Sequence, residues 1–158
     1  MKELNFLSKI KDQGKLELVN PSEELKKSYI EKSESNLKSS KILYENNLLE
    51  ESIALTYYSM YNLLIALLFK IGIKCENHTA SIILLKKLFE INNSDIENAK
   101  KERIDKQYYT DFKIKQEGIL KAIKNAEEFN NLLLDFVSKV SNSDIELFRT
   151  KFKELFKQ

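Results

Sequence analysis

Residues 53–71 limit how this chain can fold more than any other segment does. Most of their positions are apolar, and the polar ones are tyrosines, hydroxyl side chains, one asparagine and one lysine. A helix that is apolar on all sides is either buried in a bundle or spans a membrane, and a span needs roughly 20 predominantly apolar residues. Because polar residues interrupt the segment and charged stretches flank it closely, we expect a buried core helix and no contact with a membrane.

Composition narrows the classes of protein further. The chain has 158 residues with one Cys and one His, and its three glycines are isolated from one another. A chain of this length can bury most of its apolar surface in one core. One Cys excludes an intramolecular disulfide and favours a cytoplasmic setting, and the polar N-terminus does not resemble a signal peptide. Because a glycine-rich phosphate loop is missing, we expect no nucleotide cofactor.

The spacing of apolar residues predicts an all-α, up-and-down bundle of five or six helices. The clearest stripe recurs at helical spacing from Ile119 to Val140, and no segment shows the sustained alternation of a strand. Loops are predicted over 73–78 and 107–115. The helices are expected over 21–46, 49–71, 79–91, 95–106, about 119–140 and 144–157.

This pattern also predicts the organisation of the chain. Residues 1–20 are expected to form an N-terminal arm or a short helix. Residues 21–141 are expected to form the bundle, and residues 142–158 to add a C-terminal helix packed on the same domain.

Residues at the joints support these boundaries. Asn20 can cap a helix that has Pro21 in its first position. Gly72 is suited to the left-handed residue that ends a helix, and Asn77 or Thr79 can cap the next one.

The two longest predicted helices carry residues suited to close contacts. Ser33 and Ser40 lie in the stripe of the helix over 21–46 and would let a partner helix approach closely. Tyr57, Tyr58 and Tyr61 cover several faces of the helix over 49–71. Because such a helix is hard to cover within one small bundle, we expect these tyrosines to face a second copy in a homodimer.

Four short segments occur in an order that resembles the HEPN superfamily of small helical proteins associated with nucleic acids. They are Tyr-Tyr-Ser-Met-Tyr at 57–61, Asn-His-Thr-Ala at 77–80, Glu-Arg-Ile-Asp-Lys-Gln-Tyr-Tyr at 102–109 and Ala-Ile-Lys-Asn-Ala-Glu-Glu-Phe at 122–129. The resemblance covers about residues 24–140.

The resemblance implies a bundle of four or five helices that often dimerises. Many members are metal-independent ribonucleases with an Arg-x4-6-His motif at the dimer cleft. There an imidazole can take a proton from the ribose 2′-OH while a guanidinium holds the phosphate. Many members are encoded beside a minimal nucleotidyltransferase, with which they form a toxin and antitoxin pair.

This sequence departs from that motif at its histidine. Arg103 stands in the place of the motif's arginine, but the residue five positions later is Tyr108. A tyrosine has a reference pKa of about 10 and is therefore a weak base near neutrality. The single histidine is His78, and Lys74 is the basic residue four positions before it.

The stretch over 100–115 combines aromatic residues with a local excess of positive charge, although the whole chain has a net charge of only +2. Aromatic side chains amid lysines suit base stacking with phosphate contacts. The candidates for binding RNA or a nucleotide are Arg103, Lys106, Tyr108, Tyr109 and Lys74.

The catalytic candidates are Arg103, Tyr108 and His78. Arg103 would act with Tyr108, or Lys74 would act with His78 from the opposite subunit. The alternative is structural: Arg103 would pair with a neighbouring carboxylate, and Tyr108 would hydrogen-bond across the bundle.

Cys75 and His78 have the Cys-x2-His spacing of half a zinc site, which a two-fold dimer could complete. A capping or surface role explains one histidine more simply, so we predict no metal site.

Three hypotheses of function follow. The first is a non-catalytic HEPN-like protein that binds RNA or a nucleotide, or that regulates a partner of the nucleotidyltransferase type. The second is an active metal-independent ribonuclease that acts as a toxin. The third is a purely structural helical adaptor.

Overall fold

The computed structural model of this chain describes residues 1–108 and 116–157, without the side chains of residues 105–108. The prediction of an all-α fold is confirmed. Two short strands accompany the helices, β1 (Leu16–Leu18) and β2 (Ile73–Cys75). The helices are α1 (Lys2–Asp12), α2 (Glu23–Glu45), α3 (Leu49–Ile71), α4 (His78–Phe89), α5 (Ser94–Tyr108), α6 (Gln116–Lys139) and α7 (Asn142–Glu154).

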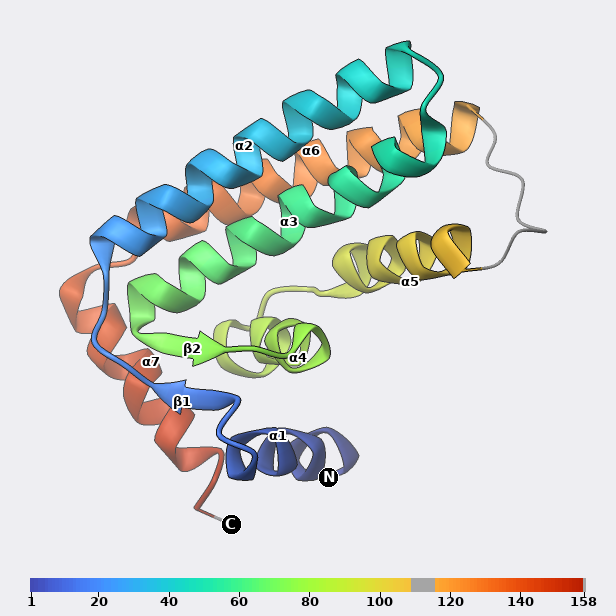
Figure 1. Ribbon diagram of the computed structural model, residues 1–158. Coiled ribbons are helices and arrows are strands. Elements are labelled where there is room, and N and C mark those ends of the chain that lie inside the picture. The colour runs from blue at the N-terminus through green and yellow to red at the C-terminus, as the bar shows by residue number, and fades with distance from the viewer. Residues whose placement is uncertain (109–115, 158) are drawn as a thin grey trace.

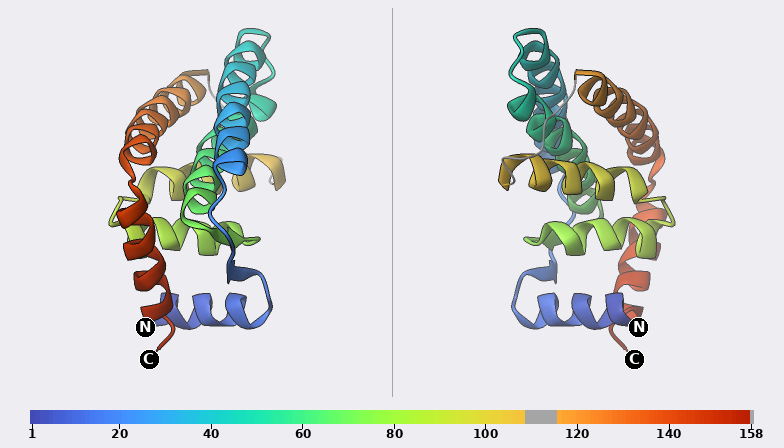
Figure 2. Two further views of the ribbon diagram at one scale, coloured as in Figure 1. Left: turned by 90° about the vertical axis from the view of Figure 1, so that its left-hand side faces the viewer. Right: turned by 90° about the vertical axis from the view of Figure 1, so that its right-hand side faces the viewer.

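The long helices α2, α3 and α6 lie side by side and form the body of the molecule (Figure 1). The shorter helices α5, α4 and α1 are stacked one below another, and α7 runs down beside the lower ones (Figure 2). Helix α3 is in the middle, since it contacts α2, α4, α5, α6 and α7.

Helix α3 is the one helix in the described residues that is long and apolar enough to cross a membrane, and 78% of its apolar window is buried inside the protein. Its burial is that of a core helix. The apolar stripe of α6 covers part of it, and Ile119, Ala126 and Leu133 of that stripe are fully buried.

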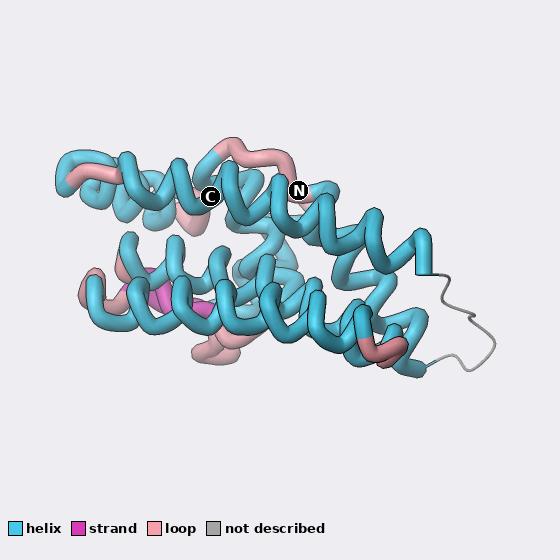
Figure 3. The backbone as a smooth tube through the Cα atoms, turned by 90° about the horizontal axis from the view of Figure 1, so that it is seen from above, coloured by secondary structure: helices cyan, strands magenta, loops and turns pink. Residues whose placement is uncertain are grey.

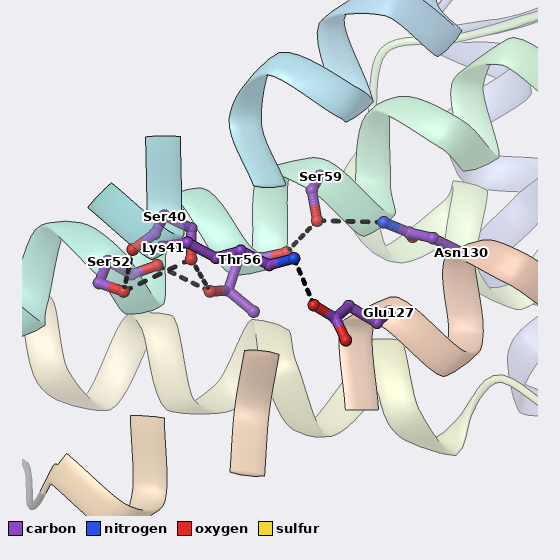
Figure 4. A network of polar contacts seen from close by, with 7 residues as sticks. All are labelled: Ser40, Lys41, Ser52, Thr56, Ser59, Glu127 and Asn130. Atoms are coloured by element: carbon purple, nitrogen blue, oxygen red, sulfur yellow. Dashed lines mark hydrogen bonds and ion pairs between the residues drawn. The ribbon is translucent and has the colours of Figure 1, made fainter. Parts of the chain in front are cut away.

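Small polar side chains hold α2 against α3, as the serines in the sequence predicted. The Ser33 hydroxyl donates to the Ser59 carbonyl at 2.6 Å, and Ser40 and Thr56 share a hydrogen bond of 2.6 Å. Figure 4 shows the hydrogen bond between Ser40 and Thr56 together with the link from α6, in which Asn130 donates to the Ser59 hydroxyl. Because each hydroxyl is buried and paired, the two helices approach closely at little cost in desolvation.

The prediction of a loop over 73–78 is wrong at its beginning. Residues Ile73–Cys75 form β2, which pairs with β1 in antiparallel register, Leu16 opposite Cys75 and Leu18 opposite Ile73. Figure 3 shows this pair in magenta among helices and loops. Strands of three residues are too short to produce a visible alternation in the sequence.

The predicted start of α2 is also wrong, because Ser22 and not Asn20 caps the helix. The Ser22 hydroxyl accepts from the Leu25 amide at 3.1 Å. The residues before it stay extended because the Val19 amide donates to the Gly72 carbonyl and the Ser22 amide to the Phe69 carbonyl. The end of the predicted helix over 95–106 moves as well, since α5 continues to Tyr108.

Helix α7 holds the end of α3 in place. Gly72 ends α3 in the left-handed conformation, with φ 83° and ψ 45°, as predicted. The Arg149 guanidinium of α7 donates to the carbonyls of Val19, Ile71 and Gly72 at 2.8, 3.0 and 3.0 Å. One arginine therefore ties together the chain before α2, the end of α3 and the last helix.

We predict that Gly72→Ala destabilises the protein by roughly 2 kcal/mol or more, because a left-handed alanine is strained. Its added Cβ would also lie 2.5 Å from the Val19 carbonyl oxygen and against Arg149. Thermal unfolding followed by circular dichroism should show a Tm lower by roughly 4–8 °C.

Gly118→Ala is the matched control: this glycine lies in α6 with nothing within 4 Å of an added Cβ. Alanine there should raise stability by roughly 0.5–1 kcal/mol. An unchanged Tm for Gly72→Ala would contradict this account of the α3 end.

Candidate functional site

Three tyrosines of α3 surround the single histidine. The rings of Tyr61 and His78 are stacked, with centroids 3.8 Å apart and planes 13° apart. The Tyr57 hydroxyl and His78 Nδ1 are 2.8 Å apart and share a hydrogen bond. Asn77 fixes the position of His78, because its side chain accepts from the Ala80 amide and so begins α4 at the histidine.

Arg103 reaches the same tyrosines from α5. Its Nη1 donates to the Tyr58 hydroxyl at 2.6 Å. Its guanidinium carbon lies 5.0 Å from the ring centroid of Tyr57 and 5.2 Å from that of Tyr58, within the range of cation–π attraction. We call Tyr57, Tyr58, Tyr61, His78 and Arg103 the Arg–Tyr–His cluster.

The surroundings of the cluster keep its histidine neutral. Burial lowers the pKa of His78, and the positive charges of Arg103 and Lys100 lower it further. Burial also raises the pKa of Tyr57, and it raises that of Tyr61 to about 12. Near neutral pH the cluster therefore presents an uncharged imidazole that can accept a proton and two buried phenols that keep theirs.

The positive charge of Arg103 has no carboxylate partner within the described side chains. Its Nε is buried, and no described group accepts a hydrogen bond from it. Lys100 lies nearby on α5, where its Nζ donates to the Thr79 hydroxyl, and burial and Arg103 lower its pKa. Two partly desolvated cations side by side attract an anion more strongly than solvated ones would.

The other predicted residues do not belong to this cluster as far as the structure describes them. Lys74 lies on β2 and forms ion pairs with Glu76 at 2.8 Å and with Glu17 at 3.6 Å. Tyr109 and the side chains of Lys106 and Tyr108 lie outside the described residues. Of the three tyrosines proposed for a dimer interface, Tyr57 is fully buried in its own chain, Tyr61 is 9% exposed, and Tyr58 is half-buried.

The sequence identified Arg103 and His78 separately but did not predict that they meet. It paired Arg103 with Tyr108, and His78 with Lys74. In the structure both residues contact Tyr57 from different helices. Such a contact between helices cannot be inferred from the spacing of residues in the sequence. Lys100 was counted in the positive stretch over 100–115, but its position near His78 and Arg103 was not predicted, for the same reason.

No group of three His, Cys, Asp or Glu side chains is placed to hold a metal ion in the part of the chain that the structure describes. The Cys75 Sγ donates to the Asn77 carbonyl at 3.4 Å, and His78 packs on the tyrosines.

Comparison with known families adds an independent finding. The family model of the HEPN domain matches residues 26–137, a span that runs from α2 into α6 and contains the whole Arg–Tyr–His cluster. No curated protein matches the chain.

The single histidine allows a direct test of the cluster's electrostatics by proton NMR. We predict that the His78 imidazole titrates with a midpoint below the ordinary value of 6.5, and that Arg103→Gln moves the midpoint up toward it. Lys139→Gln, at an exposed position of α6, should leave the midpoint unchanged. The His78 imidazole binds a proton more readily in the unfolded chain than in the folded protein. The free energy of unfolding should therefore fall as the pH drops below 6.5. A midpoint at or above 6.5 would contradict the described burial.

Proposed function

Because this chain belongs to the HEPN domain family, we propose that it is an RNA-binding protein whose binding site is the Arg–Tyr–His cluster. The observation that carries the proposal is the state of Arg103. Its guanidinium is held on two tyrosine rings, and no described carboxylate neutralises it.

A phosphate is the ligand that best completes such a site. Guanidinium groups bind phosphate oxygens with charge-assisted hydrogen bonds, which are stronger than neutral ones. The half-buried Tyr58 ring and the His78 ring lie beside the cation and offer surfaces on which a base can stack. RNA can therefore bind through a phosphate on Arg103 and through bases on the rings of Tyr58 and His78.

We predict that the protein binds single-stranded RNA with an affinity that falls as salt rises, since cations on phosphates release counterions. Arg103→Gln should weaken binding at least about tenfold, because a hydrogen bond to a charged group contributes roughly 1.5–3 kcal/mol. Fluorescence anisotropy with a labelled oligonucleotide across a salt series measures both effects.

Lys139→Gln is the control for loss of one positive charge, because Lys139 is 74% exposed and pairs with Asp135 on α6. Its affinity should stay within about twofold of the wild type, as an exposed ion pair contributes little. Equal weakening by both substitutions would show nonspecific attraction and contradict a site at Arg103.

A second function, RNA cleavage without a metal, is favoured by one specific observation. The neutral His78 hydrogen-bonds the Tyr57 hydroxyl and the cationic Arg103 lies over the Tyr57 ring, so a base and an anion-binding group contact the same tyrosine. With Nδ1–H donating to the Tyr57 oxygen, Nε2 of His78 is free to accept the ribose 2′-OH proton. The 2′-oxygen then attacks the adjacent phosphorus, and the 5′-oxygen leaves with a proton returned by the imidazolium. The products are a 2′,3′-cyclic phosphate and a 5′-hydroxyl.

For this second function we predict slow cleavage of RNA that persists in EDTA and leaves 2′,3′-cyclic phosphate ends. His78→Gln should reduce the rate by roughly 100-fold or more, as expected for loss of a general base. The same variant should still bind RNA through Arg103. Cleavage that is no faster than in a mock preparation, or that is unchanged in His78→Gln, would eliminate this mechanism and leave the RNA-binding proposal standing.

A further inference from the structure

A groove of about 620 Å³ adjoins the Arg–Tyr–His cluster. Its lining residues come from α2, α3 and the β2–α4 segment. Figure 1 shows α3 between α2 and that segment. We call it the α2–α3 groove. The residues that line it include Tyr29, Lys32, Tyr58, Tyr61, Phe69 and His78.

Aromatic rings line the groove along much of α3. Tyr29 and Phe69 stack with centroids 5.5 Å apart and planes 20° apart. Tyr61 and His78 form the second stack, beside Arg103's partner Tyr58. Because Tyr29, Phe69 and Tyr58 are only partly buried, they offer apolar ring surface to a ligand. Planar bases stack on such surfaces whatever their identity.

The charge of the groove suits a phosphate backbone. Lys32 is exposed, with its Nζ 5.8 Å from the Tyr29 ring centroid, and it forms no ion pair among the described side chains. Lys74 lines the opposite side and pairs at 2.8 Å with Glu76, the one carboxylate among the described residues that line the groove, and at 3.6 Å with Glu17. Lys32 in the groove and Arg103 in the adjoining cluster are cations without a carboxylate partner among the described side chains.

We propose that the α2–α3 groove holds an unpaired stretch of RNA, whose bases stack on its aromatic residues while a neighbouring phosphate binds Arg103. This inference rests on the proposed RNA binding and specifies its substrate class. Bases in a duplex are stacked on one another and cannot lie on protein rings, whereas unpaired bases can. The ligand is therefore single-stranded, and its path runs along α3 from the cluster toward Phe69.

Two groove variants and one matched control test this path. Lys32→Glu reverses the exposed charge, and Tyr29→Leu removes the aromatic ring but keeps an apolar side chain. Lys38→Glu makes the same charge reversal on α2 at an exposed position outside the groove. Binding is measured by anisotropy with a short single strand and with the same sequence annealed to its complement. Unchanged thermal unfolding confirms that each variant is folded.

We expect the single strand to bind at least about tenfold more tightly than the duplex, and each groove variant to weaken single-strand binding about tenfold, the scale of one lost stacking or phosphate contact. Lys38→Glu should weaken it no more than about twofold. Binding that depends on Arg103 but is equal for the groove variants and the control would overturn the groove path and leave the proposed function intact. Absence of any RNA binding by the wild type would overturn both.

One other outcome would also overturn the inference. If light scattering showed a dimer that Tyr29→Leu and Lys32→Glu dissociate without any loss of RNA binding, the groove would hold a second copy of the chain in place of RNA.

Discussion

Burial of α3 is the constraint on which the rest of the structure depends. The helix is apolar around almost its whole circumference, so water must be excluded from every side of it. Helix α2 approaches through buried hydroxyls, α6 adds its apolar stripe, and α4, α5 and α7 cover what remains. Arg149 of α7 then donates to the Gly72 carbonyl at the end of α3 and to the Val19 carbonyl in the chain before α2. Each surrounding helix occupies the place where it covers part of α3.

The same burial produces the chemistry of the candidate site. Tyr57 and Tyr61 are tyrosines of a core helix, and the two helices that cover that part of α3 bring His78 and Arg103 to them. Because the cluster is partly desolvated, its imidazole stays neutral and its cation stays strongly attractive to anions. The site is therefore a consequence of how α4 and α5 pack on α3.

Sequence patterns predicted those parts of the fold that depend on local spacing. Residue types at characteristic positions predicted the apolar stripe of α6, the left-handed Gly72 and the small residues of α2. The strands escaped prediction because each has three residues, and the start of α2 shifted because backbone contacts to α3 hold residues 19–22 extended. Arg103 and His78 were recognised individually. They come together because two separate helices pack on α3, and the spacing of residues in the sequence does not show that packing.

The most direct test follows the His78 imidazole signals by NMR while single-stranded RNA is added. The chain has one histidine, so these signals report on the cluster alone. If the cluster is the binding site, the signals should shift progressively and saturate at the same RNA concentration as binding measured by anisotropy. RNA that binds to saturation while the His78 signals remain unmoved would contradict the account, because it would place the RNA elsewhere on the protein.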